Sequence, residues 1–527
     1  MNIPSLKRDF GRIFTESERR LLAKAIIITF AIGMAAHAYA FFGPIFSHDS
    51  LNALYAGFEE DLYKIRLGRV LVPLYRVLTH GKLAVPWLTG LWAMLWISLA
   101  VYAVVRMFQL RGTPVLALTG GIFALNVTVT AMTATYIQEL DVDMCAMLFA
   151  ALAAWVWSRG NGRWPRIAVG AVLAALSMAL YQSYICVTIT LIMIFCILQL
   201  LNHRGAKAVL IHGLQALAML ATAALLYVGM VKIATAVCHV QLTSGDYNSV
   251  TNVLGVFGSG FVGRIAAAYN NFIWYFLKYA CQYTGFSEVC LAVVHVGLFA
   301  IPGLIGLRVL FSRRYALADK LLLVGLVLLL PLGMNFSCAL AGGAHALMHF
   351  AFGFLYLLAL LTVRFAAGPD GFLKPRTAAV SKVLAGGLTA VILLGNVQAS
   401  NAIYLKKELE REATLSTFTR VAEEMAGVEG YVPGSTPVVF CRSGSFKAAP
   451  EPFDRYRFIT GLNNGLQTTY PATYANYFKY ILKEPICIAD ADVIERIQSA
   501  PETAAMPVYP QDGYAAMVDG ALVVRLD

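Results

Sequence analysis

Charged side chains are scarce in this sequence. Asp, Glu, Lys and Arg make up 13% of the 527 residues, whereas hydrophobic residues make up 59%. A soluble protein carries about 25% charged and about 45–50% apolar residues, and a longer soluble chain divides into domains rather than enlarging one core. With a mean hydropathy of +0.67, the composition excludes a soluble globular enzyme, a disordered chain and a collagen-like repeat. It indicates a chain that lies mostly in lipid.

The motifs of soluble catalytic domains are also missing. The sequence has no Gly-rich phosphate loop, no GxSxG elbow and no GxGxxG after a strand, so nucleotide hydrolysis within the chain is not expected. Its nine cysteines occur singly, with no CxxC and no Cys/His cluster at metal-ligand spacing. Cys441 and Cys487 lie in a polar tail and could pair if that tail is in an oxidising compartment.

Long apolar runs take the place of these motifs. About 20 apolar residues cross the roughly 30 Å of membrane hydrocarbon. The first run follows a charged stretch that ends at Arg20 and is long enough to stay in the membrane, which argues against a cleavable signal peptide. We predict an all-α polytopic membrane protein of about eleven spans, near residues 21–43, 84–105, 113–132, 141–158, 166–181, 184–202, 208–235, 288–307, 318–335, 346–363 and 380–397.

Basic residues alternate between the connections. Lys and Arg gather before the first predicted span and after the second, fourth, sixth, eighth and tenth, whereas the short connections near 133–140, 181–183 and 336–345 have none. The positive-inside rule therefore predicts a cytoplasmic N-terminus and an extracytoplasmic C-terminus. This topology also accounts for the net charge of +11 without a nucleic-acid partner.

Three segments are expected outside the lipid on the outer face. The loop 44–83 contains an acidic cluster at 59–61 and an amphipathic stretch from Arg66 to Leu78, and the aromatic-rich loop 236–287 is typical of interfacial helices. The tail 401–527 alternates helical and strand patterns, with strands at 436–441 and 521–525, and predicts a small α/β domain. The domain division is thus 1–400 for the membrane module and 401–527 for the tail.

Acidic residues at the predicted outer face are candidates for chemistry, because carboxylates at membrane depth are costly and usually functional. Asp49 follows the first span, and Glu139, Asp141 and Asp143 lie where the fourth span begins. Glu139 and Asp143 are four residues apart and would share a helix face that Asp141 does not. The alternative is that these acids are solvated residues that cap a helix N-terminus.

Cations at the same face run against the positive-inside bias. Arg66 and Arg69 would share one face of the amphipathic stretch, and guanidinium groups suit phosphate. Binding of lipid headgroups or snorkelling is the alternative for these residues and for Arg76. Tyr181 and Gln182 form a polar hairpin suited to a hydroxyl-rich ligand. His345 and His349 share a helix face, but hydrogen-bonded histidines are favoured over a metal site.

Taken together, these pieces resemble the polytopic GT-C glycosyltransferases, and most closely the glucosyltransferase II type that modifies bacterial O-antigens on lipopolysaccharide. The resemblance rests on Asp49 soon after the first span, Leu67-Gly68-Arg69 before the second, and Asp141 with Met144 in the fourth. Leu180-Tyr181-Gln182-Ser183 after the fifth span and the charged helix around 404–420 complete it. Where this chain has His48-Asp49, the family commonly carries two adjacent acids.

The resemblance implies a GT-C-like membrane module in the inner membrane and an activity. The donor would be glucose on a polyprenyl monophosphate, and the acceptor a hydroxyl of an envelope glycan on the outer face, with inversion at the anomeric carbon. It also implies an enzyme that makes the donor and a flippase that delivers it.

The same resemblance assigns roles to the residues. Asp49 would be the general base and Asp141 a second carboxylate, and Arg69 with Arg66 would hold the donor phosphate. Tyr181, Gln182, His48 and Glu139 would line the sugar and acceptor site. No cofactor is required, because arginine can neutralise a monophosphate; a divalent cation (Mg²⁺ or Mn²⁺) held by Asp49 and Asp141 is the alternative.

Two other classes of function remain. A transporter or flippase of lipid-linked saccharides would also need many spans, although internal repeats and mid-membrane charges are more typical of it. A non-catalytic assembly or receptor protein would use the outer tail for binding and would tolerate the loss of Asp49.

Overall fold

The computed structural model describes residues 15–43, 47, 49–51, 58–81, 85–159, 164–243, 261–278, 288–341, 346–368, 371–442, 466 and 471–526. The chain forms two compact units. We call the first the helical unit; it comprises Met1–Ala38, Phe58–Met132 and Glu139–Ser400. We call the second the tail unit; it comprises Tyr39–Gly57, Thr133–Gln138 and Asn401–Asp527.

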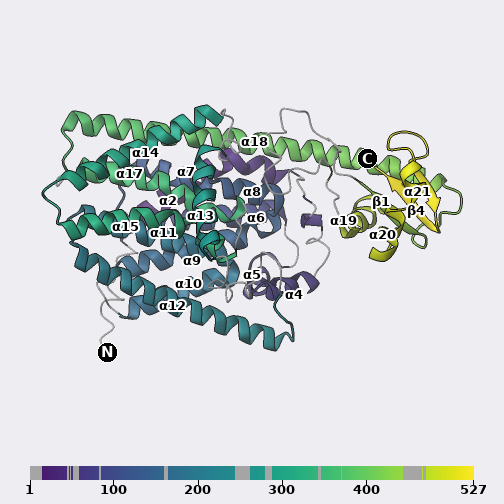
Figure 1. Ribbon diagram of the computed structural model, residues 1–527, viewed down its shortest axis with the longest axis horizontal. Coiled ribbons are helices and arrows are strands. Elements are labelled where there is room, and N and C mark those ends of the chain that lie inside the picture. Colours follow the sequence, from purple (N-terminus) through teal and green to yellow (C-terminus); the bar gives the residue numbers. More distant parts are fainter. Residues whose placement is uncertain are drawn as a thin grey trace. The chain divides into compact units, whose positions relative to one another are not determined.

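The helical unit consists of α-helices, most of them long and apolar, whose axes run in similar directions (Figure 1). The main helices are α2 (Glu16–Phe42), α6 (Pro86–Met107), α7 (Thr113–Ala124), α8 (Val127–Thr135), α9 (Leu140–Ser158), α10 (Trp164–Leu180), α11 (Ile185–Leu201), α12 (Ala206–Val237), α13 (Phe261–Leu277), α14 (Glu288–Phe311), α15 (Leu317–Met334), α17 (Phe354–Ala366) and α18 (Pro375–Gly427). The last residues of α2 and α8 and the second half of α18 belong to the tail unit. Shorter elements are α4 (Phe58–Arg66), α5 (Val72–Thr79), α16 (Phe336–Ala341) and the 3-10 turns Ile137–Glu139, Gln182–Tyr184, Ala346–Met348 and Phe350–Gly353.

Membrane-spanning segments can be compared directly with the sequence prediction. Within the described residues, nine helical segments are long and apolar enough to cross a membrane. They coincide with nine of the eleven predicted spans, and the two shorter apolar helices Trp164–Leu180 and Phe350–Ala366 coincide with the other two. The predicted positions of the apolar helices are confirmed, and the number that cross the bilayer stays a prediction.

Small residues allow the helices of this unit to approach closely. A Cβ at Gly120 of α7 would lie 2.8 Å from Thr29 Oγ1 of α2, and one at Gly170 of α10 would lie 2.5 Å from Met219 Sδ of α12. Between apolar helices in lipid, close van der Waals packing replaces the hydrophobic effect as the force of association. These glycines therefore set which helices pack together.

The predicted amphipathic stretch from Arg66 to Leu78 is two helices rather than one. Helix α4 ends at Arg66, and α5 begins at Val72 with Pro73 in its first turn. Gly68 separates them with φ +76°, a conformation that glycine adopts without the steric cost of a Cβ. The expectation that Arg66 and Arg69 share one helix face is therefore wrong, because the helix stops between them.

The second predicted outer segment, 236–287, is described in part. Its described residues contain the end of α12 and one further helix, α13. On α13, Tyr275 and Phe276 are buried, and the Tyr269 hydroxyl donates to the Leu328 carbonyl of α15 at 2.7 Å. Tyr269, Tyr275 and Phe276 thus pack within the helical unit, whereas Trp274 is 43% exposed. Tyr279 lies outside the described residues.

The tail unit contains a four-stranded sheet of order β2-β1-β4-β3. Its strands are β1 (Pro437–Cys441), β2 (Cys487–Ile488), β3 (Ala515–Val518) and β4 (Ala521–Arg525), and its helices include α19 (Pro471–Asn476), the π-helical turn Tyr477–Leu482, α20 (Ala491–Gln498) and α21 (Pro501–Ala505). Strand β1 pairs in parallel with β2 and β4, and β3 is antiparallel to β4. The strands predicted at 436–441 and 521–525 are confirmed, while the folding of 401–527 as a separate domain stays a prediction.

Two features of the tail unit follow from local rules. Asp519 and Gly520, both at positive φ, join β3 to β4 as the Asp-Gly pair of a two-residue hairpin turn. Helix α18 is 53 residues long, about 80 Å at 1.5 Å per residue, so it extends well beyond the thickness of a bilayer. Its end packs in the tail core, where Phe418 contacts Tyr474 and Phe478.

The suggested pairing of Cys441 with Cys487 does not occur, since both thiols are free. The register of β1 and β2 places Cys487 opposite Pro437, four residues from Cys441. Four residues of strand span about 13 Å, whereas disulfide-bonded cysteines need Cα atoms within about 7 Å. Strand register therefore separates the two cysteines.

Candidate functional site

Three carboxylates at the start of α9 are buried in the helical unit. The exposed fractions of Glu139, Asp141 and Asp143 are 3%, 0% and 2%. The alternative that these acids are solvated helix caps is therefore wrong. A buried carboxylate is costly unless it has charged or hydrogen-bonding partners, so the surroundings of each acid decide what it can do.

Glu139 is the centre of an ion-pair network with the two short helices α4 and α5. It pairs with Arg76 of α5 and lies 3.3 Å from Lys64 Nζ of α4. Lys64 also contacts Glu60 at 2.8 Å, and Arg76 contacts Asp61 at 3.2 Å and Glu60 at 3.6 Å.

This network holds the two cations, Lys64 and Arg76, in place. Burial acts to lower the pKa of Arg76, and Glu139 with Glu60 and Asp61 raises it above its ordinary value, so the guanidinium stays charged. The second carboxylate oxygen of Glu139, Oε2, has no hydrogen-bond partner among the described residues. Glu139 thus holds the α4–α5 segment in place and keeps one oxygen for a further donor.

Asp141 has different partners. Its Oδ2 accepts a hydrogen bond of 2.9 Å from the Tyr75 hydroxyl, which in turn accepts 2.8 Å from Trp96 Nε1. Burial and the nearby Asp141 raise the pKa of Tyr75, so the phenol remains a donor. His80 Nε2 lies 3.5 Å from the same oxygen. In the described part of the chain, Asp141 Oδ1 has no partner.

Arg69 is carried by a tight turn that several side chains hold. The Arg69 N–H donates to the Lys64 carbonyl at 2.9 Å, and the Gly68 N–H donates to the Ile65 carbonyl at 2.9 Å. These two bonds are the Schellman motif that ends many helices at a left-handed glycine. Gln182 Nε2 donates to the Leu67 carbonyl at 2.8 Å and to the Tyr227 hydroxyl at 2.8 Å.

Further bonds attach the same turn to the helices behind it. The Tyr227 hydroxyl donates to the Gly68 carbonyl at 3.2 Å, and the Leu71 N–H donates to the Ala179 carbonyl at 3.0 Å. The turn is therefore connected to α10, to the Gln182–Tyr184 turn and to α12. Gln182, predicted to line the sugar site, uses both N–H donors to position this backbone.

The Arg69 guanidinium lies over the ring of Tyr181, 4.2 Å from its centroid. Burial acts to lower the pKa of Arg69, and Tyr181, Asp143 and Glu139 together raise it above its ordinary value. Among the residues that the structure describes, no carboxylate oxygen lies within 4 Å of it. A half-buried guanidinium that is oriented by an aromatic ring but not paired at short range can accept an anion.

Arg66 is placed differently. It is the last residue of α4 and its side chain is exposed, while its backbone carbonyl accepts from the Thr243 N–H at 3.1 Å. The structure therefore separates the two predicted phosphate ligands: Arg69 is oriented by the fold and Arg66 is not.

Asp49 belongs to the tail unit and lies on a short helical segment, 49–51, where it is half-buried. Ser47 donates to the Thr135 carbonyl, and the Ser50 hydroxyl donates to Gln138 Oε1 at 2.9 Å. These bonds attach the segment that carries Asp49 to residues 133–138 within the same unit. His48 lies outside the described residues.

The tyrosine-rich hairpin between α10 and α11 lies inside the helical unit. Tyr181 and Tyr184 are both buried and their rings meet edge to face at 5.6 Å between centroids. In the described part of the chain, the Tyr184 hydroxyl has no hydrogen-bond partner. A buried hydroxyl of this kind is available for a ligand.

At His345 and His349, the sequence favoured hydrogen-bonded histidines over a metal site. The described residues contain no group of three or more His, Cys, Asp or Glu side chains that could hold a metal ion. His345 lies outside the described residues, and His349 is buried with its ring stacked on Phe352 at 4.7 Å.

Several residues of the site were not singled out by sequence reasoning, namely Lys64, Tyr75, His80, Trp96 and Tyr227. A partial signal existed, because Lys64 follows Glu60 by four residues, the spacing of a helical ion pair. Trp96 and Tyr227 lie in apolar helices, where nothing local distinguishes a hydrogen-bonding aromatic residue from a packed one.

Comparison with known proteins adds the family. No curated protein and no solved structure matches the chain. The family model described as glucosyl transferase GtrII matches residues 38–363, which is more than half of the chain and includes Asp49, Arg69, the three carboxylates of α9 and the Tyr181–Gln182 hairpin. The expected resemblance is therefore confirmed, and the protein belongs to the GtrII glucosyl transferase family.

Proposed function

We propose that this glucosyltransferase takes glucose from a polyprenyl monophosphate and transfers it, with inversion, to a hydroxyl of an envelope glycan such as the O-antigen. The reaction would occur at the outer face of the cytoplasmic membrane. The family membership indicates that glucose is the transferred sugar. The polyprenyl monophosphate donor, the outer face of the membrane and the inversion are our proposal.

The observation that carries the proposal is the setting of Arg69. Its guanidinium is charged, half-buried and oriented by Tyr181, and the turn beneath it is held by Gln182 and Tyr227. A departing polyprenyl phosphate develops negative charge on its oxygens, and a pre-oriented cation at that position stabilises the transition state. Guanidinium suits phosphate because its N–H groups match two oxygens at once.

The chemistry of the step balances without a cofactor. The acceptor oxygen attacks the anomeric carbon, and its proton passes to a carboxylate, for which we propose Asp49 as general base. The bond between the anomeric carbon and the phosphate oxygen breaks, and the phosphate leaves toward Arg69, with Arg66 as a weaker second cation. We assign Asp141 as the carboxylate that orients the acceptor, since one of its oxygens is fixed by Tyr75 and the other has no partner among the described residues.

The sugar and the acceptor would be bound by polar side chains. Tyr181, Gln182, His48 and Glu139 are the proposed sugar and acceptor contacts. Glu139 Oε2 and the carbonyl oxygen of Gln182 are the groups that would accept from sugar hydroxyls. A divalent cation on Asp49 and Asp141 is the alternative to direct carboxylate chemistry, and loss of transfer in chelator would support it.

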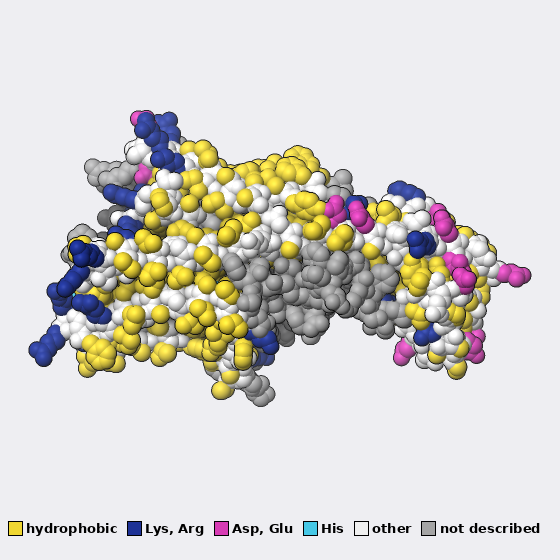
Figure 2. Space-filling model, turned by 90° about the horizontal axis from the view of Figure 1, so that it is seen from above, with side chains coloured by type: hydrophobic (Ala, Val, Ile, Leu, Met, Phe, Trp, Pro, Cys, Tyr) yellow, Lys and Arg dark blue, Asp and Glu magenta, His cyan; other side chains and the backbone are white. Residues whose placement is uncertain are grey.

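The outer-face location is proposed from charge. Figure 2 shows Lys and Arg side chains gathered at one end of the helical unit, beyond a broad apolar flank. The positive-inside rule assigns the connections after α6, α9, α11 and α14 to the cytoplasm. The buried carboxylates begin α9, at the opposite end of that helix from Arg159. The same rule would place the N-terminus inside and the C-terminus outside.

The test is a transfer assay with purified full-length protein in liposomes, radiolabelled polyprenyl-phosphate glucose and envelope glycan. We expect Asp49→Asn and Asp141→Asn to lose transfer and Arg69→Gln to lower kcat/KM by about 10²–10³-fold, the usual effect of removing one transition-state donor. Lys232→Gln, an exposed cation near the end of α12, is the matched control and should keep full activity.

Each outcome of this assay separates the possibilities. Transfer at the wild-type rate in Asp49→Asn would discard the proposed base but keep the donor. An unchanged kcat/KM in Arg69→Gln would show that Arg69 does not stabilise the departing phosphate, and would refute the proposal. No transfer from any of a panel of lipid-linked sugars, combined with movement of such lipids between leaflets, would favour the transporter alternative. The anomeric configuration of the product, read by NMR, tests inversion.

A further inference from the structure

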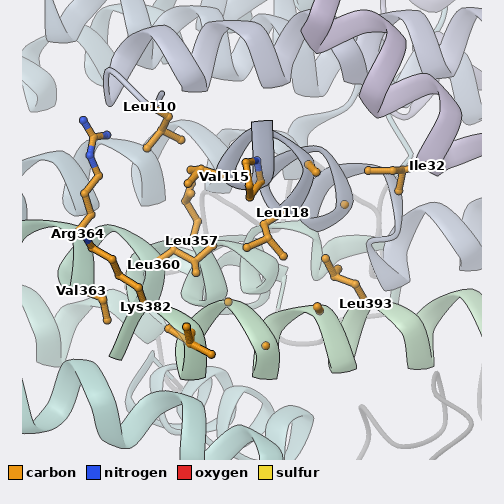
Figure 3. A pocket seen from close by; sticks show the side chains of 18 of the residues that line it. Ile32, Leu110, Val115, Leu118, Leu357, Leu360, Val363, Arg364, Lys382 and Leu393 are labelled. Atoms are coloured by element: carbon orange, nitrogen blue, oxygen red, sulfur yellow. The ribbon is translucent and has the colours of Figure 1, made fainter. Parts of the chain in front are cut away.

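A pocket of about 1070 Å³ lies between α2, α7, α17 and α18 of the helical unit. Its wall is apolar, with side chains such as Ile32, Leu118, Leu357 and Leu393 (Figure 3). Val383 and Leu394, which also line it, are 73% and 56% exposed. The pocket is therefore open at the side of the helical unit, where an apolar surface of a membrane protein meets lipid.

Two of the cations that line this pocket lie toward the same end of it. Arg111, Arg364 and Lys382 line it, and in Figure 3 Arg364 and Lys382 lie toward one end while Ile32 and Leu393 lie toward the other. Lys382 and Leu393 are eleven residues apart on α18, which corresponds to about 16 Å of helix. The pocket is thus elongated, with a basic mouth and an apolar remainder.

The three cations have no close counter-ion in the part of the chain that the structure describes. Among the described residues, no carboxylate lies within 4 Å of any of them. Arg364 donates to the carbonyls of Phe108 at 3.1 Å and Gln109 at 2.7 Å, which orients the guanidinium without neutralising it. Arg111 acts on Arg364 as a like charge. Like charges held together beside an apolar pocket are destabilising unless an anion joins them.

We propose that this pocket binds one anionic two-chain phospholipid, with its phosphate among Arg111, Arg364 and Lys382 and its acyl chains along the apolar wall. A group of the size of a water molecule occupies about 30 Å³, so the pocket holds roughly 35 such groups, about the number of carbons in two acyl chains. Charge complementarity at the mouth and apolar volume behind it match the two parts of such a lipid.

The proposed phospholipid site is separate from the proposed site of the sugar donor. The basic mouth lies at the start of the span Thr113–Thr135, and the buried carboxylates begin just after its end. The span has 23 residues and is interrupted between α7 and α8, so its two ends are at most about 35 Å apart. The lipid therefore belongs to the leaflet at the basic end and does not occupy the proposed phosphate site at Arg69.

The test is native mass spectrometry of the purified full-length protein, titrated with phosphatidylglycerol or with phosphatidylcholine. The double variant Arg111→Gln/Lys382→Gln removes two cations of the mouth. Each Lys or Arg near an anionic lipid contributes roughly fivefold in affinity, so the variant should bind phosphatidylglycerol about 25-fold more weakly. Lys207→Gln/Arg313→Gln removes two exposed cations outside the pocket and should bind as the wild type does.

A second variant tests the pocket without changing charge. Gly387 lines the pocket, and a Cβ there would meet nothing within 4 Å. Gly387→Leu should therefore fold normally, since leucine favours a helix more than glycine does, and should fill space that the acyl chains need. It should lose tight binding of phosphatidylglycerol while its melting temperature without added lipid stays close to that of the wild type.

Three results would overturn the proposal. Equal affinity of wild type and Arg111→Gln/Lys382→Gln for phosphatidylglycerol would show that the mouth does not bind the headgroup. Equal binding of phosphatidylcholine by the wild type would show that charge does not select the lipid. Displacement of the bound phosphatidylglycerol by polyprenyl phosphate would assign the pocket to the donor instead.

Discussion

The ion-pair network around Glu139 gives the sharpest quantitative prediction, and the change to make is Glu139→Gln. Glutamine keeps the shape of the side chain and removes its charge. Glu139 is 3% exposed, pairs with Arg76 and lies 3.3 Å from Lys64. The substitution therefore removes one anion that serves two buried cations.

The size of the destabilisation depends on which anionic partners Lys64 and Arg76 retain after the substitution. Two unit charges 3.3 Å apart attract by about 5 kcal/mol at an effective dielectric constant of 20, and removing one partner of a buried pair costs about 3–5 kcal/mol. Lys64 keeps Glu60 at 2.8 Å, and Arg76 keeps Asp61 at 3.2 Å. We therefore expect the free energy of unfolding to fall by about 3 kcal/mol, the low end of that range. For a large chain this corresponds to a melting temperature lower by about 6 °C.

The assay is thermal unfolding of the full-length protein in detergent, with Glu60→Gln as the matched control. Glu60 contacts the same two cations, but its side chain is 16% exposed and Glu139 remains to pair with them. We expect it to cost about 1 kcal/mol, or about 2 °C. The double variant Lys64→Met/Glu139→Gln should recover at least half of the loss, because it also removes the cation left without its partner.

Two results would refute this reasoning. A Glu139→Gln protein that melts within about 1 °C of the wild type, or a Glu60→Gln protein that is equally destabilised, would show that Glu139 is not the centre of the network. Unchanged melting with loss of transfer would instead make Glu139 a substrate contact, as the family resemblance alone implied.

Three further predictions concern the turn, the carboxylate and the helix packing. Tyr75→Phe removes the hydrogen bond to a buried carboxylate and should lower transfer about tenfold, from a loss of about 1–2 kcal/mol, with little change in donor KM. Gly68→Ala places a Cβ at φ +76° and should cost about 1 kcal/mol in thermal unfolding and raise the KM for the lipid donor. Gly120→Ala brings a Cβ to 2.8 Å from Thr29 Oγ1 and should lower the free energy of unfolding by about 1–3 kcal/mol. In the control Gly229→Ala the Cβ meets nothing within 4 Å, so that variant should be neutral or stabilised by up to about 1 kcal/mol. Equal melting temperatures of these two variants would contradict the packing argument.

The positions of the apolar helices could be predicted from the hydrophobicity of the sequence. An apolar run of about 20 residues is a local property, since each backbone group in lipid must be satisfied within its own helix. The positions of the apolar helices, including Trp164–Leu180 and Phe350–Ala366, were therefore predicted to within about five residues, except that α18 continues to Gly427, well beyond the predicted end at 397. The strands Pro437–Cys441 and Ala521–Arg525 were found for a similar reason, because β-branched runs between turn residues are local too.

Candidate site residues could be chosen by type and location but not by role. Asp141 and Glu139 were singled out because carboxylates at membrane depth are usually functional, and Arg69 because a cation at the predicted outer face runs against the positive-inside bias. Their separation into an arginine without a close partner, an aspartate held by Tyr75 and a glutamate in an ion network was not predictable. The shared face of Arg66 and Arg69 was predicted wrongly, because helical spacing does not show where a glycine ends the helix.

The sequence by itself determined that this is a mostly helical membrane protein, where its apolar helices lie, and which family it belongs to, because those properties reside in local composition and in short motifs. Only the tertiary structure decided which charges are buried and paired, how Gln182 and Tyr227 hold the turn of Arg69, and that three cations border an apolar pocket. These depend on contacts between residues tens to hundreds of positions apart, which local patterns do not encode.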